Sequence, residues 1–165
     1  MTNKDDILEF IQNVPHASGQ NYIIGIDGEV YDFETSAGEV VRYNPENDNN
    51  AVYHTNHPVV NTNLKKWYES YSPKLTIREL PVTSNSYVRF KSLENGMNSK
   101  SEIETESIKN ILRSKEDPNN PVCNSWSPNG GFTFASTIMS LGEDPFLLIT
   151  AGPPDESEYK TFTFQ

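Results

Sequence analysis

A chain of 165 residues suits one domain, and its 23 acidic against 13 basic residues give a formal net charge of -10. This balance argues against a nucleic-acid binder, because phosphates would be repelled. Hydrophobic residues make up 35% of the chain, below the usual share for a globular domain. We therefore expect either an open fold or a core that is completed by another chain.

The sequence shows no signal for a membrane or for export. No apolar run reaches the ~18 residues that a membrane-spanning helix needs, and the polar N-terminus does not resemble a secretory signal. The one cysteine, Cys123, excludes an internal disulfide. We expect a cytoplasmic protein.

The first predicted element is a helix that ends before Pro15. Thr2 and Asp5 resemble a capping pair at its start. Its apolar residues recur at helical spacing: Ile7, Phe10, Ile11 and Val14.

A meander of short strands is predicted next, at residues 22–26, 30–34, 40–43 and 51–54. Asp27-Gly28 is a strong signal for a hairpin turn between the first two. Residues 36–38 form a second turn, and the Asn-rich segment 44–50 is a loop. The fourth strand leads the chain toward Asn56.

Helices are expected at residues 64–71, at 86–93 and around 108–112, followed by a connection rich in proline. The last predicted strands cover residues 131–139, 146–150 and 159–164, with a turn at 142–145. This order predicts an α+β fold. No repeat or linker marks a boundary, so residues 1–165 are predicted to form a single domain.

Two histidines, His54 and His57, lie three residues apart. They could bind a metal, but no third ligand has a suitable spacing, so no metal site is expected. The alternative is that both rings hydrogen-bond to backbone at the end of a strand.

Three other residues could carry chemistry. Asn56 could donate a hydrogen bond to an oxyanion, or it could simply occupy a turn. Arg89 could be a solvated arginine on an amphipathic helix. Cys123 has no neighbouring base or cation to activate it, which favours a structural thiol.

Several segments, taken in order, resemble the isopenicillin-N acyltransferase family, which is related to choloylglycine hydrolases and penicillin V acylases. The segment His54-Thr55-Asn56-His57-Pro58 is the most specific of them. The others are Ala17-Ser18-Gly19-Gln20-Asn21-Tyr22, Asp27 with Glu34, Ser86-x-x-Arg89-Phe90, Val122-Cys123, residues 132–139 and Ala151-Gly152-Pro153-Pro154.

The resemblance implies part of an N-terminal-nucleophile (Ntn) hydrolase fold, an αββα sandwich with antiparallel sheets and helices outside. It implies that an N-terminal cysteine attacks an amide carbonyl, with its own α-amine as the base. The acyl group would then pass to water or to an amine. A small-molecule amide or acyl donor is the implied substrate, and no cofactor is expected.

The resemblance also assigns roles to individual residues. Asn56 matches the asparagine of the oxyanion hole, and Arg89 matches the arginine that orients the nucleophile. Ser86 matches the serine before that arginine, and Asn21 a motif asparagine on the first strand that organises the sheet. His54 and His57 match motif positions, and we expect them to support the site rather than transfer protons.

The chain differs from this family in lacking the segment that carries the nucleophile. In one hypothesis it is the C-terminal part of a linear amide hydrolase or acyltransferase, and a missing or separate chain supplies the cysteine. In the alternative it is an inactive remnant that acts as a binding or interaction protein. An enzyme that uses Cys123 or a histidine is a third, less favoured hypothesis. Either of the first two predicts a homo-oligomer or a complementary N-terminal chain, because an open sheet invites pairing.

Overall fold

A computed structural model describes residues 3–26, 28–46, 51–63 and 84–163 of the chain. Contacts divide the chain into two compact units, residues 1–87 and residues 88–165, and each is described by itself. The prediction of a single domain stays a prediction. Within the described residues, none of the helices is both long and apolar enough to cross a membrane.

The first unit begins with helix α1, Lys4–Asn13. Its N-cap is Asn3, whose side chain accepts a 2.8 Å hydrogen bond from the backbone N–H of Asp6. The predicted capping pair of Thr2 and Asp5 is therefore wrong, because Asn3 already occupies the position just before the first turn. The helix ends before Pro15, as predicted, and Val14 is extended as expected for a residue before proline.

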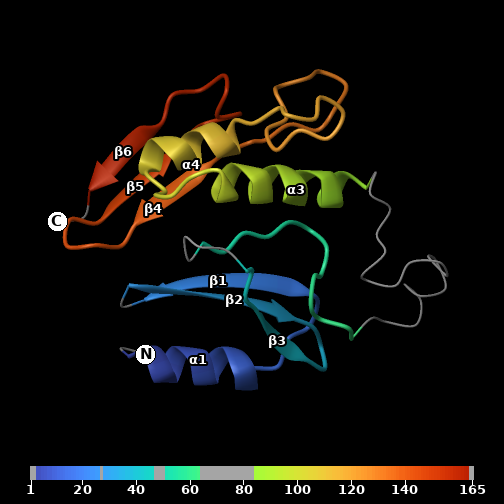
Figure 1. Ribbon diagram of the computed structural model, residues 1–165, viewed down its shortest axis with the longest axis vertical. Helices are drawn as coiled ribbons and strands as arrows, with labels where there is room; N and C mark the ends of the chain where they lie inside the picture. Colours follow the sequence, from blue (N-terminus) through green and yellow to red (C-terminus); the bar gives the residue numbers. More distant parts are fainter. Residues whose placement is uncertain (1–2, 27, 47–50, 64–83, 164–165) are drawn as a thin grey trace. The chain divides into compact units, whose positions relative to one another are not determined.

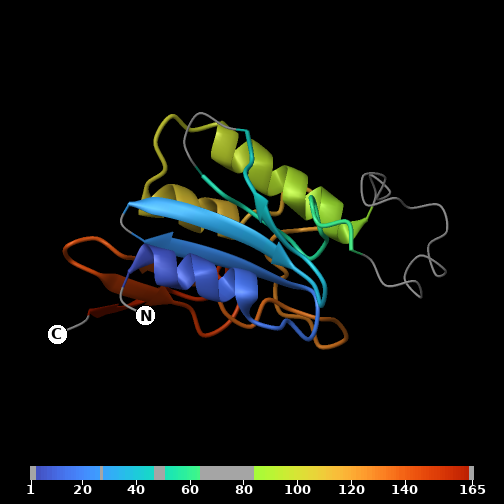
Figure 2. The same ribbon diagram turned by 90° about the horizontal axis from the view of Figure 1, so that it is seen from below.

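A three-stranded antiparallel sheet follows, made of β1 (Gln20–Ile26), β2 (Glu29–Thr35) and β3 (Val40–Tyr43) in that order. The predicted meander is confirmed for these three strands. Helix α1 lies along one face of the sheet (Figures 1 and 2). There Ile11 of the helix forms a buried core with Tyr31 and Phe33 of β2.

On the other face of this sheet the side chains of β2 are polar, and they are buried too. Asp32 and Glu34 alternate with the two core aromatics, so their side chains point away from α1. In the register, Glu34 lies opposite Asn21 of β1, and Asp32 lies opposite Tyr43 of β3. The hairpin thus brings an amide and two carboxyl groups together on one face.

The predicted fourth strand at residues 51–54 is wrong, because this segment has no regular secondary structure. Tyr53 is nevertheless buried. The apolar pattern indicates burial, and burial does not require a strand partner. The helix predicted at residues 64–71 lies outside the described residues.

The second unit contains the remaining helices and a second sheet. Helix α3, Asn85–Asn98, starts at the end of the first unit and runs five residues beyond the prediction; α4 spans Thr105–Leu112. A Cβ added at Gly96 of α3 would lie 2.9 Å from the side chain of Ile111, so glycine permits this close approach to α4. Strands β4 (Thr137–Ser140), β5 (Phe146–Ile149) and β6 (Lys160–Thr163) are antiparallel and adjacent in that order.

Only the last part of the predicted strand 131–139 is a strand, because pairing with β5 begins at Thr137. The other two strands of this sheet are confirmed. In the described part of the chain, two antiparallel sheets and three helices make up an α+β fold, as predicted. These elements are consistent with part of an Ntn-hydrolase fold.

Candidate functional site

The carboxylate of Glu34 is the centre of the polar face of β2. Its Oε2 accepts hydrogen bonds from the backbone N–H groups of Val60 (2.9 Å) and Asn61 (2.6 Å). Its Oε1 accepts from the backbone N–H of Val59 and from the ring of His54. Burial alone would raise the pKa of Glu34, but these hydrogen bonds outweigh burial and lower it.

His54 forms a buried ion pair with Glu34, with 2.7 Å between Nε2 and Oε1. Its Nδ1 lies 2.5 Å from the carbonyl oxygen of Thr55. Both neighbours are acceptors, an arrangement that favours the doubly protonated, cationic imidazole. Burial alone would lower the pKa of His54, but Glu34 and the Thr55 carbonyl outweigh it and raise the pKa. The ring also meets Tyr43 edge to face, at 6.1 Å between centroids.

Asp32 is fully buried beside this pair. Its Oδ1 accepts a hydrogen bond from the side-chain amide of Asn21, whereas its Oδ2 has no hydrogen-bond partner among the residues that the structure describes. Burial is the main cause that raises the pKa of Asp32, and the nearby charge of Glu34 adds to it. The sequence placed Asn21 on the sheet, and the structure identifies Asp32 as its partner.

A second set of hydrogen bonds fixes the other side of the His-Thr-Asn-His segment. His57 Nδ1 lies 2.8 Å from the hydroxyl of Ser86, and the hydroxyl of Thr55 donates to the Ser86 carbonyl at 2.9 Å. The hydroxyls of Thr55 and Ser86 lie 3.1 Å apart. The alternative that both rings hydrogen-bond to backbone stays a prediction for His57, whose ring contacts the side-chain hydroxyls of Thr55 and Ser86. His54 binds one backbone carbonyl and one carboxylate.

Asn56 lies at a bend between these two anchored histidines and is exposed to solvent. The structure therefore brings four predicted residues into the first unit around one segment: His54, Asn56, His57 and Ser86. An exposed side-chain amide on a fixed loop can donate a hydrogen bond to a ligand oxygen. Its predicted role at an oxyanion stays a prediction.

Arg89 belongs to the second unit, on the first turns of α3, where it is half-buried. Burial lowers the pKa of its guanidinium. Ser86 and Arg89 are three positions apart on one helix, a spacing that places both on the same face.

Cys123 is fully buried in the second unit. Its thiol donates to Oδ1 of Asp155 at 3.0 Å, and burial together with this bond raises its pKa to about 11. A nucleophilic cysteine needs an accessible thiolate, so this thiol is poorly suited to attack.

The sequence interpretation gave no role to Asp32, Glu34 or Thr55. The sequence did contain a signal that the carboxyl groups of Asp32 and Glu34 share one face of the sheet. They alternate with Tyr31 and Phe33, and these aromatic residues mark the strand as central. Nothing in the sequence indicates that Glu34 binds backbone amides 25 to 27 residues later.

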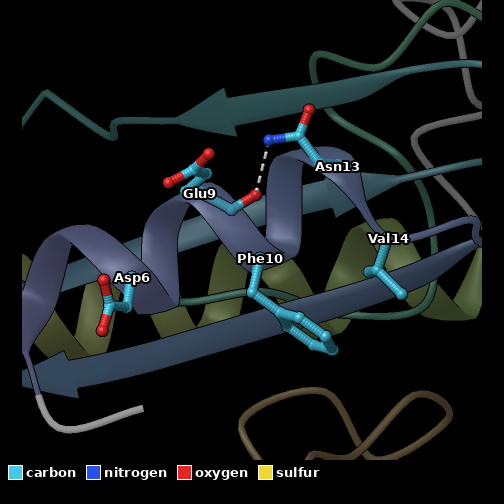
Figure 3. Close-up of a pocket in the computed structure, with 5 residues that line it drawn as sticks. All are labelled: Asp6, Glu9, Phe10, Asn13 and Val14. Atoms are coloured by element: carbon cyan, nitrogen blue, oxygen red, sulfur yellow. Dashed lines mark hydrogen bonds between the residues drawn. The ribbon is translucent and has the colours of Figure 1, made fainter.

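Two other observations concern ligand sites. A shallow hollow over α1 is lined by Asp6, Glu9, Phe10, Asn13 and Val14 and contains none of the predicted site residues (Figure 3). In the part of the chain that the structure describes, no three His, Cys, Asp or Glu side chains gather as metal ligands would.

A family model described as acyl-coenzyme A:6-aminopenicillanic acid acyl-transferase matches residues 1–148. No curated protein matches the chain.

Proposed function

The chain belongs to the acyl-coenzyme A:6-aminopenicillanic acid acyl-transferase family, and from this premise we propose that it forms the oxyanion-stabilising part of an Ntn-type amide hydrolase or acyl-transferase. The attacking cysteine comes from a separate or missing segment. The observation that carries this proposal is the solvent-exposed position of Asn56 on a loop whose neighbours are fixed on both sides.

The proposed reaction is acyl transfer in two steps. A thiolate attacks the carbonyl carbon of an amide or thioester, and the carbonyl electrons move to oxygen. Asn56 donates a hydrogen bond to that oxyanion, and the amine or thiol leaves with a proton. Water or an amine then attacks the acyl-enzyme and regenerates the thiol. The family's name suggests an acyl-coenzyme A as donor and an amine such as 6-aminopenicillanic acid as acceptor.

The state of Cys123 supports a thiol from elsewhere. It is the only cysteine of the chain, and it is buried with a raised pKa. Arg89 is assigned the task of orienting the incoming thiol and favouring its thiolate. His54, His57, Ser86 and Asn21 support the site.

An inactive remnant that binds a partner is the second candidate. One face of the sheet β4-β5-β6 favours it, because Met139, Leu147 and Phe162 form an apolar row across the three strands. Met139 and Phe162 are exposed. Such a row is typical of a surface that another chain covers.

The test is reconstitution. The chain is assayed for acyl transfer to 6-aminopenicillanic acid and for hydrolysis of penicillin V, alone and mixed with the product of the reading frame directly upstream. We expect activity only in the mixture. Asn56→Ala should lower the rate by about 10²–10³-fold, as for loss of an oxyanion donor, whereas Asn129→Ala, at an exposed turn, should not.

Two results would contradict the proposal. Turnover by the chain alone, whether or not it survives Cys123→Ala, would show that the nucleophile lies within residues 1–165. A mixture without activity would favour the binding protein instead.

A further inference from the structure

The loop that carries Asn56 is held by one buried carboxylate. Glu34 accepts four hydrogen bonds, one from the ring of His54 and three from consecutive backbone N–H groups of residues 59–61. The first bond lies two residues before Asn56, and the others begin three residues after it. One side chain therefore fixes both ends of the segment that contains the asparagine.

The charge of Glu34 is essential to this arrangement. A carboxylate is acceptor-only, so it can satisfy all four donors at once. A buried N–H group that loses its acceptor costs free energy, so these hydrogen bonds stabilise the observed conformation of the loop. Asn61 adds to the anchor, because its side-chain amide donates to the backbone carbonyls of Glu34 (3.2 Å) and Glu39 (3.3 Å).

The surroundings of the ion pair favour an ionised Glu34. Protonated His54 places a positive charge 2.7 Å away, and Tyr43 packs against the ring from β3; the carboxyl group of Asp32, beside the pair on β2, has a raised pKa that favours its neutral form. Asp32 accepts from Asn21 and makes none of these loop contacts.

We infer that Glu34 is a positioning residue: with His54 as its charged partner, it holds residues 54–61 in the shape that presents Asn56 to a developing oxyanion. The effect on catalysis rests on the proposed function, whereas the effect on the loop does not.

The test uses Glu34→Gln, which keeps the shape of the side chain and removes its charge. Whichever way the new amide turns, its NH₂ replaces one oxygen and faces at least one backbone N–H of residues 59–61. We expect the NMR signals of residues 54–61, including the Asn56 side-chain amide, to shift, and the pKa of His54 to fall because it loses the carboxylate of Glu34. Glu46→Gln, at an exposed glutamate of the same unit, should leave both unchanged. Glu34→Asp, which keeps the charge, should retain part of the raised His54 pKa.

The full chain provides a measurement that does not depend on a folded variant. Nitrogen-15 shifts of the His54 ring, followed against pH, should show a pKa above that of a free imidazole. A His54 ring that titrates like a free imidazole, or a Glu34→Gln loop that is unchanged, would overturn the inference.

Activity separates the inference from the proposed function. In the reconstituted enzyme Glu34→Gln should lower kcat by about 10²-fold, the scale expected when a group is misplaced by ~1 Å, with KM little changed. Adding Glu34→Gln to Asn56→Ala should then cost almost nothing further, because Glu34 acts through Asn56. If the loop shifts but Asn56→Ala is fully active, the proposed function fails and the positioning of the loop stands.

Discussion

Asp155 links distant parts of the second unit through its carboxylate. Oδ1 accepts from the Cys123 thiol, and Oδ2 accepts from the Ser125 hydroxyl at 2.8 Å and pairs with Lys115. The long connection between α4 and β4 is thereby tied to the turn that precedes β6. Burial would raise the pKa of Asp155, but the hydrogen bonds from Cys123, Lys115 and Ser125 outweigh it and lower the pKa.

This lowered pKa predicts an acid-sensitive contribution to stability. A carboxyl group whose pKa is lower in the folded state adds stability above its unfolded pKa, about 3.9, and loses it as the pH falls through the folded value. Asp155→Asn should therefore flatten the fall in unfolding free energy below pH 4, measured by urea unfolding at several pH values. Asp144→Asn, at an exposed aspartate between β4 and β5, is the control. An unchanged acid profile in Asp155→Asn would contradict this role.

Among the elements, β2 contributes residues to both faces of the first sheet, aromatic residues to one face and carboxyl groups to the other. Its aromatic residues pack against α1, and its Glu34 carboxylate binds residues of the segment 54–61. This explains why loop residues far along the chain can be fixed by a strand. The hairpin that sets this register turns at Gly28, which has a φ of 75°.

A substitution at this turn should weaken the whole hairpin. Ala at a positive φ costs about 1–2 kcal/mol, because its Cβ crowds the following carbonyl. We expect Gly28→Ala to lower the free energy of unfolding by about that amount, measured by chemical denaturation. Gly131→Ala is the matched control, since an added Cβ there meets no atom within 4 Å and its φ is not in this range. Equal effects at the two glycines would count against the turn as the cause.

For the whole molecule, we predict association with another chain. The apolar row on β4-β5-β6 leaves Met139 and Phe162 exposed. Fully burying such a side chain contributes about 1.5–3 kcal/mol. Replacing both by Thr should therefore weaken association more than tenfold, measured by sedimentation.

The control for association is Phe134→Ser, because Phe134 is 81% exposed but lies in the connection before β4. It should leave the sedimentation behaviour unchanged. A wild-type chain that sediments as a monomer at every concentration would contradict the prediction.

Local sequence signals determined most elements of this protein. Helical spacing located α1, α3 and α4, and Asp-Gly between two apolar runs located the first hairpin. These features depend on residues that are close in sequence. The pattern at residues 51–54 failed, because it reports burial and does not say whether a partner strand exists.

The sequence by itself also determined the family, through the order of its motifs, and it singled out Asn56. Only the tertiary structure decided how that asparagine is held. The anchor joins Glu34 to His54 and residues 59–61, a separation of 20 to 27 residues that no local pattern encodes. It likewise decided that Cys123 is a buried thiol with a raised pKa, because burial and the contact with Asp155, 32 residues away, raise that pKa.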